Sequence, residues 1–174
     1  AFTVGISLSS DEKYFFITSS DHNTSEQYYF DADEKEPKPK LIKKRKKGIL
    51  YSVNSWDGNF YNHTNEDAED FKIDIAEDLE KQDWKKFIPA KEEVLIGGLT
   101  FLNNWIIRSE TSDALDKLFV MNISTKKEEE ILFSNENIYV PEISLTQRDK
   151  NTDEIYLGYS SPKTQSRVYS YNLR

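Results

Sequence analysis

The stretch LSSDEKYFFITSS, Leu8–Ser20, decides the fold because its pattern returns along the chain. A polar turn leads into a short apolar run, and the run ends in small polar residues. The stretches NSWDGNFYNHTN (54–65) and TFLNNWIIRSE (100–110) follow the same order. Short apolar runs bounded by Asp, Asn, Ser and Gly indicate antiparallel hairpins, so the pattern predicts a hairpin that is repeated along the chain.

Four segments superpose on their polar ends: Tyr14–Ser20, Phe60–Asn65, Trp105–Glu110 and Ile155–Ser161. With Ser19, Asn65, Glu110 and Ser161 as markers, the pattern recurs after 46, 45 and 51 residues. The longer last step reflects a longer turn, Gln147–Glu154. A period of about 40–50 residues is typical of repeat architectures built from four-stranded units.

Each of these segments has strand-like neighbours in the same order. The runs before it are Val4–Leu8, Ile49–Val53, Val94–Leu99 and Ile138–Leu145. The runs after it are Glu26–Ala32, Asp70–Ala76, Lys117–Ile123 and Arg167–Leu173. A fourth run follows in three of the units: Lys40–Lys44, Lys86–Pro89 and Glu129–Phe133. Every full unit therefore predicts four consecutive strands.

Three local signals refine this prediction. Asp57-Gly58 predicts a tight hairpin turn, because both residue types tolerate positive φ. Gly97-Gly98 inside VLIGGLTF predicts a bulge or a close backbone approach within a strand. The alternation in FKIDIA predicts Phe71, Ile73 and Ile75 on one face of a strand.

These signals together predict an all-β fold, a fragment of a β-propeller with about four blades of four antiparallel strands. We expect blades at residues 1–46, 47–91, 92–136 and 137–174, the last of them incomplete. A single blade cannot cover both of its faces, so stacked blades bury each other's apolar residues. A β-sandwich or barrel with coincidental spacing is the alternative.

Composition limits the function classes. The 174 residues are 37% hydrophobic and 13% aromatic, with a formal net charge of −8. An acidic chain lacks the cationic surface that non-specific nucleic-acid or acidic-membrane binding requires. The chain has no cysteine, which excludes disulfides and favours a cytoplasmic location. It begins at Ala1 and is immediately strand-like, so we expect it to be part of a longer protein.

No residue pattern predicts a catalytic, metal or cofactor site. The two histidines, His22 and His63, occupy different positions in different repeats and show no metal-binding spacing. The chain has no G-x-S-x-G nucleophile motif, no G-x-G-x-x-G and no P-loop. We therefore predict no catalytic residue, no metal ligand and no cofactor within this chain.

Charged stretches offer two interpretations. The basic run Lys38–Gly48 coincides with the fourth strand of the first unit, where lysines protect an exposed edge from unwanted pairing. Binding of a polyanion is the alternative. The acidic stretches Asn65–Asp70 and Ala76–Asp83 predict a solvated rim that attracts cationic peptides at long range.

The chain also resembles a known family over almost its whole length. The matching residues are Phe60-Tyr61, Thr64-Asn65, Phe71, Trp84, Ile88-Pro89, Trp105 and Tyr159-Ser160-Ser161. In this order they resemble the β-propeller of the oligopeptidase B group of the prolyl oligopeptidase family of serine peptidases.

The resemblance implies a non-catalytic lid of four blades from a seven-bladed disc, which covers an α/β-hydrolase peptidase domain in the same chain. The parent enzyme would cleave small peptides after Arg or Lys, and the fragment alone should be inactive. Bare blade faces should make the fragment self-associate. The alternative function is a stand-alone propeller that binds a protein or glycan partner.

Overall fold

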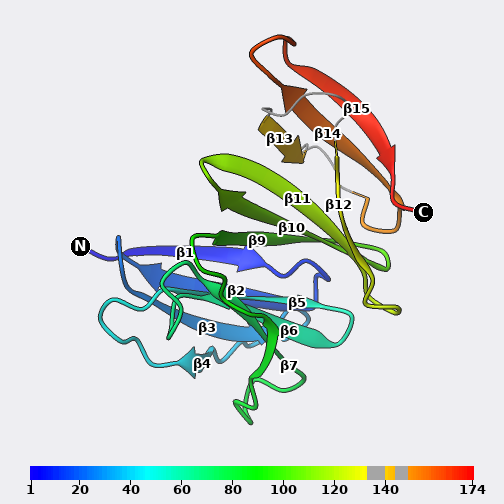
Figure 1. Ribbon diagram of the computed structural model, residues 1–174. Helices are drawn as coiled ribbons and strands as arrows, with labels where there is room; N and C mark the ends of the chain where they lie inside the picture. The colour runs from blue at the N-terminus through cyan, green and yellow to red at the C-terminus, as the bar shows by residue number, and fades with distance from the viewer. Residues whose placement is uncertain (133–139, 144–148) are drawn as a thin grey trace. The chain divides into compact units, whose positions relative to one another are not determined.

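The computed structural model describes residues 1–132, 140–143 and 149–174, and every regular element in these ranges is a β-strand (Figure 1). The strands form four antiparallel sheets in which each strand pairs with its neighbours in sequence. None of the described residues forms a helix that is long and apolar enough to cross a membrane.

The strand bounds follow the predicted repeat. The first sheet contains β1 (Thr3–Leu8), β2 (Tyr14–Ser20), β3 (Ser25–Asp31) and β4 (Lys40–Lys43). The second contains β5 (Tyr51–Trp56), β6 (Asn59–Thr64), β7 (Lys72–Ala76) and β8 (Lys85–Ile88). The third contains β9 (Leu95–Leu102), β10 (Trp105–Ser112), β11 (Leu115–Asn122) and β12 (Glu128–Glu130). The fourth contains β13 (Val140–Ile143), β14 (Glu154–Ser160) and β15 (Arg167–Asn172).

The predicted order of strands is confirmed in all four sheets, although several ends differ by one to three residues. The predicted runs Ile138–Leu145 and Glu129–Phe133 and the turn Gln147–Glu154 lie partly outside the described residues. The chain divides into two compact units, Ala1–Glu92 and Glu93–Arg174, and each unit contains two of the sheets.

The predicted turn chemistry is also confirmed. Asp57 and Gly58 connect β5 to β6 with φ angles of 49° and 75°. Positive φ at both central residues belongs to the type I′ turn, whose twist matches that of the flanking strands.

Gly97-Gly98 forms a β-bulge in the third sheet, as predicted. Arg108 pairs with Leu99 and Glu110 pairs with Ile96, so two glycines of β9 lie opposite the single residue Ser109 of β10. A Cβ added at Gly97 would lie 2.1 Å from the Ser109 Oγ, whereas one at Gly98 would meet nothing within 4 Å. The close approach of Ser109 therefore explains why residue 97 is a glycine.

The prediction that Phe71 belongs to this strand is wrong. Ile73 is fully buried in β7, but Phe71 precedes the strand and has a φ of 68°, which takes it out of the strand alternation. Its ring still lies on the same face as Ile73, because it stacks on the imidazole of His63, which pairs with Ile73, with the ring centroids 4.6 Å apart. The turn after Ala68, whose carbonyl accepts a hydrogen bond from the Phe71 N–H, accounts for the difference.

An apolar cluster joins the two sheets of the first unit. Its buried members are Phe16, Tyr29, Ile42, Tyr51, Val53, Phe60 and Leu79. Burying a large apolar side chain contributes about 1.5–3 kcal/mol, so this cluster supplies much of the cohesion between the sheets. A second cluster joins the sheets of the other unit: Leu102, Ile107, Leu118, Val120, Ile131, Ile155, Leu157 and Leu173.

β5 is an edge strand of the second sheet, and side chains of the first sheet accept hydrogen bonds from its backbone N–H groups. The Ser25 hydroxyl accepts a hydrogen bond from the Tyr51 N–H at 2.7 Å, and the Gln27 amide oxygen accepts one from the Val53 N–H at 2.7 Å. The Tyr51 hydroxyl donates to the Lys43 carbonyl at 2.5 Å. Buried polar groups are costly unless they are paired, so these bonds fix how the two sheets meet.

Asp153 has a comparable role in the second unit. Its carboxylate accepts hydrogen bonds from the Trp105 Nε1 at 2.8 Å and the Asn103 Nδ2 at 3.0 Å, and it forms an ion pair with Arg174 at 2.5 Å. The Trp105 bond is the largest of several interactions that lower the pKa of Asp153. The third and fourth sheets are therefore linked by charge-assisted hydrogen bonds as well as by apolar packing.

Candidate functional site

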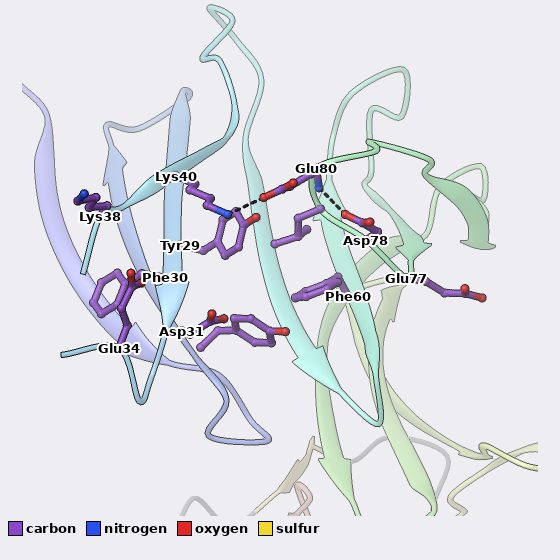
Figure 2. A pocket seen from close by; sticks show the side chains of 12 residues that line it. Tyr29, Phe30, Asp31, Glu34, Lys38, Lys40, Phe60, Glu77, Asp78 and Glu80 are labelled. Atoms are coloured by element: carbon purple, nitrogen blue, oxygen red, sulfur yellow. Dashed lines mark hydrogen bonds and ion pairs between the residues drawn. The ribbon is translucent and has the colours of Figure 1, made fainter. Parts of the chain in front are cut away.

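A cavity of about 360 Å³ lies between the first and second sheets (Figure 2). The start of β2, the end of β3 and the start of β4 line one side, and the start of β6 and the segment after β7 line the other. The lining combines the aromatic residues Tyr14, Tyr29, Phe30 and Phe60 with Leu79. The charged lining residues are Asp31, Glu34, Glu77, Asp78, Glu80, Lys38 and Lys40.

The aromatic wall belongs to the apolar cluster of the first unit. Tyr14 lies between Tyr29 and Phe60, with ring centroids 6.2 Å and 5.1 Å away. Tyr29 and Phe60 are buried, so this wall is held by packing on both sides. Aromatic rings that contact at these distances are worth about 0.5–1.5 kcal/mol beyond their buried area.

The segment after β7 is held in place by Asp78 and Leu79. The Asp78 Oδ1 accepts hydrogen bonds from the Glu80 N–H at 2.8 Å and the Lys81 N–H at 3.4 Å. The Glu80 N–H contributes most to lowering the pKa of Asp78. Leu79 is buried in the apolar cluster, so its neighbour Glu80 is fixed at the mouth of the cavity.

An ion pair crosses the cavity mouth. The Lys40 Nζ of the first sheet lies 2.6 Å from the Glu80 Oε1 of the second, as Figure 2 shows. The two side chains are 62% and 65% exposed. The hydrogen bond to Glu80 raises the pKa of Lys40. Exposed pairs of this kind contribute little to stability, so an incoming charge can displace either partner.

Negative charge dominates the cavity. Burial raises the pKa of Tyr14, and the charges of Asp31 and Asp11 raise it further. Burial also raises the pKa of Tyr29; Lys40 opposes this rise, whereas Glu80, Asp78 and Asp31 add to it. Carboxylates that disfavour a phenolate also attract a cation to the same space.

Two further hollows adjoin this cavity. One of about 360 Å³ shares Tyr14 and Asp31 with it, and one of about 180 Å³ shares Glu77 and Asp78. The three hollows follow one another along the first unit. Such a row of spaces suits an extended chain better than a single small molecule.

The charged stretches of the sequence meet at this junction of sheets. As predicted, β4 is an edge strand of its sheet, but two of its lysines and the nearby Arg45 also bind carboxylates. The pairs are Lys40–Glu80, Lys43–Glu66 and Arg45–Glu26. The acidic stretches are therefore more than a solvated rim, because Glu66 and Glu80 connect the second sheet to the first.

Glu26 is the most buried carboxylate among these pairs. It accepts a hydrogen bond from the Arg45 backbone N–H at 2.9 Å and another from the Arg45 guanidinium at 3.0 Å. The backbone bond is the largest of the interactions that lower the pKa of Glu26.

The histidines do not come together. His22 is exposed in the turn between β2 and β3, whereas His63 stacks on Phe71 in the second sheet. The described residues contain no group of three or more His, Cys, Asp or Glu that could hold a metal ion. Sequence reasoning missed the cavity, although the aromatic residue near the start of a second strand (Tyr14, Phe60) was a visible signal.

Comparison with known proteins agrees with the β-propeller blades inferred from the sequence repeat. The family described as the N-terminal beta-propeller domain of prolyl oligopeptidase matches residues 1–174. Protease 2 of Moraxella lacunata is 25% identical over 185 residues, which cover 99% of this chain and 24% of the relative. Dipeptidyl aminopeptidase BI of Pseudoxanthomonas mexicana is 23% identical over 177 residues, which cover 100% of this chain and 24% of the relative. The chain thus spans about a quarter of the length of these relatives.

Solved structures show the same fold. Oligopeptidase B from Trypanosoma brucei, with covalently bound antipain, matches with a TM-score of 0.90 and 23% identity, over 99% of this chain and 26% of that chain. Oligopeptidase B from Leishmania major matches with a TM-score of 0.87 and 18% identity, over 99% and 26% of the two chains. Together with the family match, these similarities confirm the predicted β-propeller fragment.

Proposed function

Because the chain belongs to the N-terminal β-propeller domain family of the prolyl oligopeptidases, we propose that it helps to restrict which peptides reach the catalytic residues of a serine peptidase. The observation that carries this proposal is the family match over all 174 residues. The catalytic residues would lie in an α/β-hydrolase domain of the same parent protein. The four sheets correspond in this proposal to blades at residues 1–46, 47–91, 92–136 and 137–174.

Short peptides cut after Arg or Lys are the proposed substrates of the parent protein. Two similar structures are named oligopeptidase B, and the acidic cavity of the first unit is compatible with basic peptides. A rim of stacked sheets admits a short or unstructured peptide, but it excludes a folded protein by size. Lids that close over an active site sequester the reaction from water.

The test uses the full-length protein that contains this chain. Short reporter peptides with Arg, Lys or Pro before the cut are compared with a folded protein that carries the Arg sequence in a loop. We expect rapid cleavage of the Arg and Lys peptides and little cleavage of the folded protein. Cleavage after Pro alone contradicts the specificity, and equal cleavage of the folded protein contradicts the restriction of access.

The 174-residue chain alone serves as the second arm, and we expect it to be inactive on the arginyl reporter. Inhibitor-sensitive turnover by the purified chain would contradict the assignment of catalysis to another domain. The alternative of a stand-alone binding module is tested by reading the flanking gene sequence. A reading frame that continues into a Gly-x-Ser-x-Gly-Gly stretch supports the peptidase, and a stop directly after Arg174 supports the binding module.

A further inference from the structure

We infer that the basic loop after β4, residues 44–47, binds an acidic segment of the peptidase domain, so that this end of the first unit faces that domain. The inference rests on the proposed function for the existence of the peptidase domain. The choice of this loop follows from its unpaired lysines, its fixed backbone and its acidic neighbours.

Three lysines of the basic loop have no carboxylate partner. Protection of a sheet edge explains Lys40 and Lys43, because both lie in β4, which ends at Lys43. Lys44, Lys46 and Lys47 lie beyond the strand, and all three are exposed. Within the described part of the chain, none of these three forms an ion pair. Edge protection therefore does not account for their charges.

The backbone of the loop is held by hydrogen bonds to both sheets. The Arg45 N–H and the Arg45 guanidinium donate to the buried Glu26 carboxylate at 2.9 Å and 3.0 Å. The Gly48 N–H donates to the Thr24 Oγ1 at 3.2 Å, and the Gly48 carbonyl accepts a hydrogen bond from the Asn65 Nδ2 at 3.1 Å. A partner therefore does not have to order this backbone when it binds, which reduces the entropic cost of binding.

The surroundings of the loop favour a short acidic protein segment over a long polyanion. Asn65, whose side chain contacts Gly48, is followed by four carboxylates in the stretch 66–70. The net charge of the whole chain is −8. These negative charges repel a nucleic acid or an acidic membrane that extends beyond the three lysines. A segment with only a few carboxylates can contact the lysines without approaching the acidic stretch.

The small number of free lysines favours a partner in the same protein. Exposed ion pairs each contribute little, so three of them would give a separate protein only a weak affinity. A domain that is linked through the polypeptide has an effective concentration on the order of millimolar, at which weak contacts are sufficient to orient it. The peptidase domain of the proposed function is a partner of this kind.

Zero-length coupling tests the contact in the full-length protein that contains this chain. A carbodiimide joins a lysine amine to a carboxylate that it contacts, and mass spectrometry of the digested product identifies both residues. We expect Lys44, Lys46 or Lys47 to couple to Asp or Glu residues outside residues 1–174. The yield should fall severalfold as salt is raised from about 0.05 M to about 0.5 M, because salt screens exposed charges.

The matched controls are Lys13, Lys35 and Lys38, which are also exposed but lie in loops at the opposite end of the first sheet. They should couple outside residues 1–174 much less than the lysines of the basic loop. The absence of such coupling from the basic loop, or equal coupling from the control lysines, overturns the inference.

A second arm tests the polyanion directly. Fluorescence anisotropy measures binding of a labelled DNA duplex to the full-length protein and to its triple variant Lys44→Gln, Lys46→Gln, Lys47→Gln. We expect weak and similar binding by both proteins, with circular dichroism to establish that the variant is folded. Tight binding that is lost in the triple variant overturns the inference in favour of a polyanion.

Arginyl-reporter hydrolysis by the same preparation tests the proposed function separately. A protein that cleaves the reporter but shows no coupling from the basic loop refutes only the docking surface. A protein that couples as expected but does not cleave the reporter refutes only the peptidase assignment.

Discussion

Replacing Gly97 with alanine should destabilise the third sheet much more than replacing Gly98. Both glycines form the bulge of β9 opposite Ser109. Both substitutions reduce the conformational freedom of the unfolded chain to a similar degree, and neither glycine has positive φ. The difference between the two variants therefore isolates the contact with Ser109.

The magnitude follows from three distances. A Cβ at Gly97 would lie 2.1 Å from the Ser109 Oγ, 3.0 Å from its carbonyl oxygen and 3.2 Å from its Cβ. Rotation of the hydroxyl can relieve the first contact, but the other two require backbone movement. Overpacking of this kind costs about 1–3 kcal/mol. Gly98→Ala meets nothing within 4 Å and should be neutral or stabilising by up to about 1 kcal/mol.

Urea unfolding of the 174-residue chain, followed by far-ultraviolet circular dichroism, measures the free energy of unfolding for each variant. The two compact units need not unfold together, so hydrogen exchange of the backbone amides in β9 and β10 localises the effect. The double variant Gly97→Ala with Ser109→Ala should regain part of the loss, because only the closest contact disappears. Equal stability of the Gly97→Ala and Gly98→Ala variants would refute the role assigned to Ser109.

Three further predictions concern the first unit. Tyr51→Phe should lower the free energy of unfolding by about 1–3 kcal/mol, because it leaves buried hydrogen-bonding groups without a partner. The control is Tyr156→Phe, at an exposed tyrosine, which should change little in the same urea assay. The pKa of Glu26 is lower in the folded than in the unfolded state. As the pH falls below about 4.3, the Glu26 carboxylate is therefore protonated in the unfolded state first, and the stability that the charged Glu26 contributes at higher pH is lost. Glu26→Gln should flatten this part of the profile of unfolding free energy against pH, and an unchanged profile would contradict the assignment. Val4 and Ile6 of β1 are 72% and 63% exposed, so we expect the isolated chain to self-associate through this strand. The double variant Val4→Lys with Ile6→Lys should associate less, and a wild-type chain that is monomeric at all concentrations in light scattering would contradict the prediction.

Local signals explain why so much of the fold could be predicted. Turn residues at Asp57-Gly58, the glycines at Gly97-Gly98 and the alternation of short strands act within a few residues of each other. The predicted strand begins too early at Phe71, which belongs to the turn that begins near Ala68. An alternating pattern of residues does not reveal where a strand begins when the preceding turn contains residues that fit the same alternation.

The candidate site could not be predicted in the same way. Lys40 and Glu80 are 40 residues apart, and Tyr14 and Phe60 belong to different repeats. The sequence showed a basic stretch and two acidic stretches, but it gave no indication that they pair across adjacent sheets. Such contacts depend on how two faces pack, and packing is set by many side chains at once.

The sequence by itself determined that the chain consists of repeated antiparallel sheets, because a period of polar turns and short apolar runs permits few other solutions. Only the tertiary structure decided that the first and second sheets enclose an acidic, aromatic-walled cavity with Lys40 at its mouth. The physical reason is the range of the interactions involved. Hairpins are specified by neighbouring residues, whereas a cavity exists only where two separately specified surfaces meet and leave space between them.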